Sequence, residues 1–193
     1  MILAVSTFAA VRFGSRSARV TERALLAGLL PILVPSRIHD PVEKIRFADD
    51  HWIAVDGGHA IAEVGEGAVY LAIALRNVGH GLAFLDRWDF YPSDITVESP
   101  REIDHFHRLT RDLYVPAGDL GFWQGTFRDE SDPAFHAAKD AITGREALTV
   151  DLLYGDHEGG QRTISRFILT PRGETEWLST VSRHWRLDGG VRR

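Results

Sequence analysis

The sequence predicts an all-β protein, an antiparallel β-sandwich with an N-terminal helix and one internal helix. Turn signals recur about every eight to twelve residues between short apolar segments, which is the spacing expected of a β-sandwich. Residues 69–75, VYLAIAL, form an almost continuous apolar run, as a strand buried on both faces does. Inside the domain a strong helical pattern covers only residues 132–144. Together these features predict roughly seven to nine strands and one connecting helix.

Composition limits the classes of function. At 193 residues the chain has room for one domain and an appendage. A formal net charge of -5 argues against a general nucleic-acid binder, which is usually basic. The absence of cysteine excludes disulfides, thiol nucleophiles and cysteine-ligated zinc.

Residues 1–30 join an apolar start to a basic continuation. The first eleven residues carry no charge, and four arginines then fall on one face of a helix: Arg12, Arg16, Arg19 and Arg23. An apolar run with arginines at its C-terminal side is typical of a membrane segment whose flank stays in the cytoplasm. The sequence therefore predicts a membrane-associated helix over residues 1–30, followed by a β-sandwich domain over residues 31–189 that faces the cytoplasm.

The length of the apolar segment leaves three readings open. Eleven helical residues rise roughly 16 Å, whereas the hydrocarbon core of a bilayer is about 30 Å thick. The segment is either the end of a longer spanning helix whose upstream residues are missing, or a helix in the membrane interface with its arginines at the head groups. The third reading is a soluble helix packed on the domain.

Strands are predicted where β-branched and aromatic residues alternate or run together between turn residues. Gly57 and Gly58 separate two short apolar runs, which predicts a hairpin. Asn77 and Gly79 end the long apolar run, and residues 82–91 resume it. Further strands are predicted in the remaining apolar segments, within the ranges 31–37, 40–49, 112–127, 148–156, 161–169 and 176–187.

The internal helix has recognisable signals at both ends. Asp132 can cap the first turn, and Pro133 suits the first helical position. Gly144 suits the end of the helix. Between them every feature of the segment DPAFHAAKDAITG agrees with a helix over residues 132–144.

Four segments resemble one group of proteins. LRNVGHGLA (75–83), YVPAGD (114–119) and LLYGDHEGGQRTISRFIL (152–169) resemble the turns and hairpins of uncharacterised bacterial membrane-anchored proteins, chiefly actinobacterial, with an immunoglobulin-like β-sandwich. RSARVTERALLAGLLPILVPSR (16–37) is similar to their juxtamembrane stretch. The resemblance implies an immunoglobulin-like sandwich behind an N-terminal membrane helix. It implies no established activity and no catalytic residue.

Polar turn residues are the first candidates for a site. In LYGDHEGGQRT (153–163), the consecutive side chains of Asp156, His157 and Glu158 could hold a metal, but a turn explains them better. An aspartate in this position can accept hydrogen bonds from backbone N–H groups two residues on, and the two glycines supply positive φ. A side-chain amide followed by glycines can likewise tie a strand end to its turn. The residues assigned to structural turns are Asn77, Gly79, Gly81, Asp156, Gly159 and Gly160.

A histidine pair supports the alternative of a metal-dependent hydrolase. His105 and His107 would project to the same side if their segment were a strand, and Asp156 with His157 could complete a hydrolytic centre. The polar segment 99–109 is more simply a solvated loop or short helix. These four residues are therefore weak candidates, and no catalytic residue, metal or cofactor is assigned.

The function expected from the sequence is non-enzymatic binding of a protein or small ligand at the membrane. Aromatic residues gather near turns and belong mostly to the core, but any exposed group of them would mark an interaction face: Trp88, Phe90, Tyr91, Phe122, Trp123 and Phe127. Nucleic acid is not expected as a partner. A purely structural domain of a larger membrane assembly is the second alternative.

Overall fold

The computed structural model describes residues 28–93 and 99–188, and it confirms the all-β class with one internal helix. The expected helix over residues 1–30 and its arginines Arg12, Arg16, Arg19 and Arg23 therefore lie outside the described residues, apart from the last three positions. The elements are β1 (Leu33–Pro35), β2 (Glu43–Arg46), β3 (Trp52–Val55), β4 (His59–Gly65), β5 (Ala68–Asn77), β6 (Ala83–Tyr91), η1 (Ile103–His105), β7 (His107–Val115), β8 (Leu120–Phe127), α2 (Pro133–Thr143), β9 (Leu148–Gly155), β10 (Thr163–Arg172) and β11 (Glu176–Arg186).

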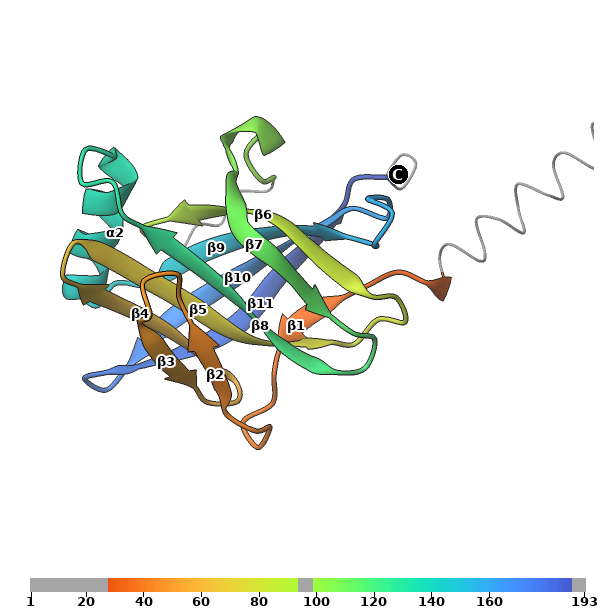
Figure 1. Ribbon diagram of the computed structural model, residues 1–193, viewed down its shortest axis with the longest axis horizontal. Coiled ribbons are helices and arrows are strands. Elements are labelled where there is room, and N and C mark those ends of the chain that lie inside the picture. The colour runs from red at the N-terminus through yellow and green to blue at the C-terminus, as the bar shows by residue number, and fades with distance from the viewer. Residues whose placement is uncertain (1–27, 94–98, 189–193) are drawn as a thin grey trace, which may run out of the picture.

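Nine of these strands form one antiparallel sheet. Its order is β1-β5-β4-β11-β10-β9-β6-β7, and β8 pairs with β5. Leu75 and Arg76 of β5 pair with both β1 and β8, so these two strands lie on opposite sides of β5. β8 and β7 are consequently the two end strands, and the sheet curls until they lie side by side (Figure 1). The immunoglobulin-like sandwich is not confirmed, because these strands belong to one continuous sheet and not to two.

The concave side of the curled sheet holds the main core. Strands far apart in the sheet order contribute to it together, for example Leu71 of β5, Trp123 of β8 and Phe167 of β10. Helix α2 covers part of this core with its apolar face. Asp132 caps the helix by accepting a hydrogen bond from the N–H of Ala134 at 2.8 Å, as predicted. The left-handed residue after the helix is Arg145 and not Gly144, whose φ is negative.

A second core lies on the outer side of β5. The small hairpin β2–β3 covers it, and Ile45 and Val55 of that hairpin pack against Tyr70 and Ala72 of β5. This explains why nearly all of β5 is buried, as its continuous apolar run predicted. The hairpin predicted at Gly57–Gly58 is wrong, since β3 pairs with β2 while β4 pairs with β5.

Asn77 joins three segments at the end of β5. Its Oδ1 accepts hydrogen bonds from the N–H groups of Ile32 and Gly79, at 3.1 and 2.9 Å. Its Nδ2 donates to the carbonyl oxygens of Gly81 and Val115, at 2.7 and 3.0 Å. The side chain is fully buried, and each of its hydrogen-bonding groups has a partner.

Gly79 and Gly81 allow the chain before β1 to approach this turn. A methyl group on Gly81 would lie 1.8 Å from the carbonyl oxygen of Leu29, and one on Gly79 would lie 2.2 Å from that of Leu30. Neither glycine has positive φ. The chain bends at these glycines, and their lack of a side chain permits the close backbone contact.

Candidate functional site

The middle of β7 leaves its ladder with β6. Leu85 pairs with Leu113 and Arg87 with Arg108, so residue 86 alone stands opposite residues 109–112. Such a bulge bends a strand and redirects its side chains, and bulges are common beside functional sites. Here the bulged segment faces β8. Within the described residues no backbone ladder joins β7 to β8.

A cleft between β7 and β8 contains two adjoining hollows, both lined by Thr110 and Gln124. The first, here named the Trp88 hollow, has a volume of about 180 Å³, and it is also lined by Trp88, His107, Arg108, Leu109, Gly125 and Thr126. The second, here named the Phe47 hollow, has a volume of about 260 Å³, and it is also lined by Arg46, Phe47, Ala48, Asp50 and Arg111. The cleft therefore combines backbone edges with aromatic and cationic side chains.

Aromatic rings form one wall of the Trp88 hollow. The His107 ring lies against the Trp88 ring, with 4.9 Å between centroids, and it meets the Phe127 ring edge-on at 5.6 Å. Gly125 lets these rings approach β8, because a methyl group there would lie 2.6 Å from the Trp123 ring and 3.0 Å from that of Trp88. The wall is thus packed and fixed in place.

Positive charge collects at the cleft although the chain is acidic as a whole. Arg111 donates to Oε1 of Gln124 at 2.7 Å, and its guanidinium lies 5.5 Å from the centre of the Phe122 ring. Among the described residues no carboxylate lies within 4.0 Å of Arg111 or Arg108, whereas Arg46 is paired with Asp50. Two exposed arginines are therefore free to attract an anionic group.

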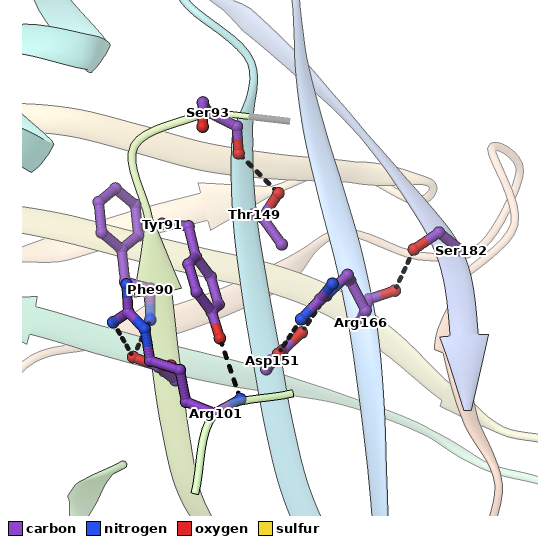
Figure 2. Close-up of polar contacts among 9 residues, drawn as sticks. Phe90, Tyr91, Ser93, Arg101, Thr149, Asp151, Arg166 and Ser182 are labelled. Atoms are coloured by element: carbon purple, nitrogen blue, oxygen red, sulfur yellow. Dashed lines mark hydrogen bonds and ion pairs between the residues drawn. The ribbon is translucent and has the colours of Figure 1, made fainter. Parts of the chain in front are cut away.

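A group of buried polar side chains lies on the outer face of β6, β9 and β10 (Figure 2). Arg166 binds both carboxylate oxygens of Asp151 in a bidentate pair, at 2.7 and 2.6 Å. Its guanidinium also lies 5.4 Å from the Tyr91 ring and 4.9 Å from the Trp185 ring. Burial raises the pKa of Asp151, while the adjacent Arg166 acts in the opposite direction.

Arg101 fixes the segment that leads into β7. Its guanidinium donates to Asp89 at 3.3 Å and lies 4.2 Å from the centre of the Tyr91 ring, and its N–H donates to the Tyr91 hydroxyl at 3.4 Å (Figure 2). Phe106, a few residues further on, packs with Leu153 and Trp185 on the same outer face. These contacts hold the start of β7, and with it His107, at the edge of the cleft.

Tyr91 makes this group sensitive to alkaline pH. Burial, followed by the negative charges of Asp151 and Asp89, raises its pKa to about 12 from 10.0. A phenol whose folded-state pKa is raised contributes stability below the unfolded pKa, and this contribution is lost as the pH rises from 10 towards 12. Over this interval the free energy of unfolding of the native protein should fall by about 2–3 kcal/mol more than that of the Tyr91→Phe variant. Urea unfolding of both proteins at several alkaline pH values measures the difference, and identical slopes would contradict the assignment.

The polar segment LYGDHEGGQRT (153–163) forms a structural turn. Oδ1 of Asp156 accepts hydrogen bonds from the N–H groups of Glu158 and Gly160, at 3.0 and 2.8 Å. His157 and Glu158 point into solvent. Gly159 has the expected positive φ, but Gly160 does not, and the second left-handed residue is Gln161 with φ 49°. The expectation of a positive φ at Gly160 is therefore wrong, because Gln161 adopts this left-handed conformation instead.

The histidine pair does not project from one strand. His105 ends the short helix η1 and is exposed, whereas His107 begins β7 and contacts Trp88. In residues 28–93 and 99–188 no three histidine, cysteine or acidic side chains are grouped so as to hold a metal ion. The geometry thus gives no support to the hydrolase alternative built on His105, His107, Asp156 and His157.

The principal residues of the cleft and of the buried polar group were not identified from the sequence. Asp151 and Arg166 interrupt the apolar strands LTVDLLYG and TISRFIL, and opposite charges in the middle of neighbouring apolar strands are a signal for a buried pair. Arg108, Arg111 and Gln124 carried no comparable signal, because the cleft exists only where the two sheet ends meet.

Comparison of the chain with protein-family models, with curated proteins and with solved structures gave no match. Among the described residues, no helix has the length and apolar character needed to cross a membrane. The arguments for function therefore come from the geometry of the cleft.

Proposed function

We propose that this chain is a membrane-associated, non-enzymatic binding domain whose ligand site is the cleft between β7 and β8. The observation that carries the proposal is the bulged segment of β7, which presents Arg111, without a carboxylate partner among the described residues, beside the free edge of β8. The polar side chains around it, chiefly those of Arg108, Thr110, Arg111 and Gln124, are suited to holding a ligand by hydrogen bonds and charge. The aromatic wall adds apolar contact.

Membrane attachment and family relationship belong to the same proposal. The arginine-flanked segment within residues 1–30 supports attachment, with the domain facing the cytoplasm. The resemblance to bacterial membrane-anchored proteins with an immunoglobulin-like sandwich is supported by its quoted segments, and by an all-β class that it shares with this chain.

Site-specific photo-crosslinking in the native host tests the binding site. A photoreactive amino acid replaces Thr110, which lines both hollows, or Lys139, which is exposed on α2. We expect an adduct from position 110 but not from position 139, and we expect Arg111→Glu to abolish it. Arg183→Glu makes the same change of charge at an exposed position of β11 and should leave the adduct intact.

The opposite result would reject the cleft as the site. Equal adducts from both positions, or an adduct that survives Arg111→Glu, would favour a structural domain surrounded by a larger assembly. Equal urea midpoints of the two glutamate variants confirm that the fold is not the cause, because exposed substitutions usually change stability by less than about 0.5 kcal/mol.

Membrane fractionation tests the attachment. The protein, expressed with its native upstream region, should pellet with membranes after carbonate extraction. The domain should resist protease in intact cells and be digested after lysis. Recovery in the soluble fraction would refute the anchor, and digestion in intact cells would reverse the proposed orientation.

A further inference from the structure

We propose that the occupant of the cleft is an extended, acidic peptide strand of a partner protein, which adds to the free edge of β8. This inference rests on the proposed function and gives its ligand a chemical class. Strand addition of this kind combines main-chain hydrogen bonds with pockets for alternate side chains.

The edge of β8 is open to a further strand. In the part of the chain that the structure describes, β8 pairs with β5 alone, and its residues Gln124, Gly125 and Thr126 line the cleft. Alternate residues of this stretch therefore direct their backbone N–H and C=O groups towards the cleft. Proteins usually protect such an edge with charged residues, proline or a bulge in the edge strand itself. The sequence of β8, LGFWQGTF, has neither a charged residue nor proline, and its pairing with β5 is regular.

The arrangement of the hollows suits an extended chain, because two adjoining spaces of about 180 and 260 Å³ lie along one cleft. The hollows share Thr110 and Gln124, so one extended segment can pass along both. Successive side chains of a strand point to opposite faces, which would place alternate side chains in alternate hollows.

The linings of the hollows indicate which side chains fit. Trp88 and Leu109 offer apolar contact in the Trp88 hollow, whereas Arg111 offers a free cation in the Phe47 hollow. An alternation of apolar and acidic residues satisfies both. The terminal segments of the chain itself carry the wrong charge, because residues 1–27 hold four arginines and one glutamate, and residues 189–193 end in two arginines.

Binding of designed peptides to the full chain tests the inference. The first probe is a capped peptide of alternating valine and glutamate, matched to the eight residues of β8. The second has lysine in place of glutamate. Two further probes carry N-methyl groups on one or the other edge of the valine–glutamate peptide, which blocks its hydrogen bonding on that edge. Amide chemical shifts in NMR spectra report where each peptide binds and how tightly.

We expect the valine–glutamate peptide to shift the amides of β8 and to protect them from hydrogen exchange. Arg111→Glu should weaken this binding about tenfold, and the matched Arg183→Glu should not. The lysine peptide and one of the N-methylated peptides should bind at least about tenfold more weakly than the valine–glutamate peptide.

Two results would overturn strand addition. One is equal binding of both N-methylated peptides, which would indicate a site for anions only. The other is that no peptide binds while the crosslink at position 110 still depends on Arg111, in which case the binding domain stands and its ligand belongs to another class. If no peptide binds and the crosslink at position 110 does not depend on Arg111 either, the proposed function itself is refuted.

Discussion

Replacing Arg166 with methionine is expected to lower the free energy of unfolding by about 3–5 kcal/mol, because it leaves Asp151 buried without its partner. Both side chains of this pair are essentially inaccessible, at 1% and 0% exposure. The pair joins β9 to β10 on the outer face, and Arg166 also contacts the rings of Tyr91 and Trp185. Urea unfolding near neutral pH measures the loss.

The pH dependence of this loss identifies its cause. Burial already raises the pKa of Asp151, and without Arg166 that pKa should rise further. A carboxyl group with a raised folded-state pKa lowers stability as the pH rises above its unfolded pKa, so the deficit of Arg166→Met should shrink on acidification to about pH 4. A deficit that is independent of pH would instead indicate lost packing.

Two matched variants separate the charge from the side-chain volume. Arg172→Met changes the same residue type at the exposed end of β10 and should cost less than about 0.5 kcal/mol. The double variant Asp151→Leu, Arg166→Met removes both charges and should recover most of the stability lost in the single variant. If the double variant is less stable than Arg166→Met alone, the unpaired carboxylate is not the cause.

Asn77→Ala is expected to cost roughly 3 kcal/mol or more in the free energy of unfolding, because four backbone groups, three of them buried, lose their partner together. The N–H of Ile32 precedes β1, and the carbonyl of Val115 ends β7. The substitution therefore loosens the attachment of the N-terminal segment and one end of the cleft at once. Thermal or urea unfolding gives the loss of stability.

Asn77→Asp provides an internal control for this hydrogen-bonding role. One carboxylate oxygen can still accept from Ile32 and Gly79, but the other would face the carbonyl oxygens of Gly81 and Val115. Protonation restores one donor, so this variant should be partly rescued at acidic pH, whereas Asn77→Ala should not. Val78→Ala, in the same turn but exposed, should cost less than about 0.5 kcal/mol. Equal losses for Asn77→Ala and Val78→Ala would contradict the role of the amide.

The features that depend on neighbouring residues could be predicted from the sequence. The strands, the cap of α2 at Asp132 and the turn at Asp156 all follow from local hydrogen bonding and from the alternation of apolar residues. Asn77 belongs with them in part, since its bonds to Gly79 and Gly81 lie within its own turn, although those to Ile32 and Val115 do not. Positive φ at Gln161 in place of Gly160 shows that even a local pattern allows more than one backbone solution.

The neighbours of several strands depend on the tertiary structure, because pairs such as β4–β11 and β6–β9 join residues far apart in the chain. The expectation of two sheets failed for this reason. The hairpin expected at Gly57 failed for a local reason, because β3 forms its hairpin with the preceding β2 and β4 forms its own with the following β5. The charges of Asp151 and Arg166 are buried because the segment before β7 packs over the outer face of the sheet. The cleft also depends on the tertiary structure, although β7 and β8 follow one another in the chain. Among the described residues these two strands share no ladder and end opposite sides of one sheet, and the curl of that sheet places Arg111 against Gln124 across the gap.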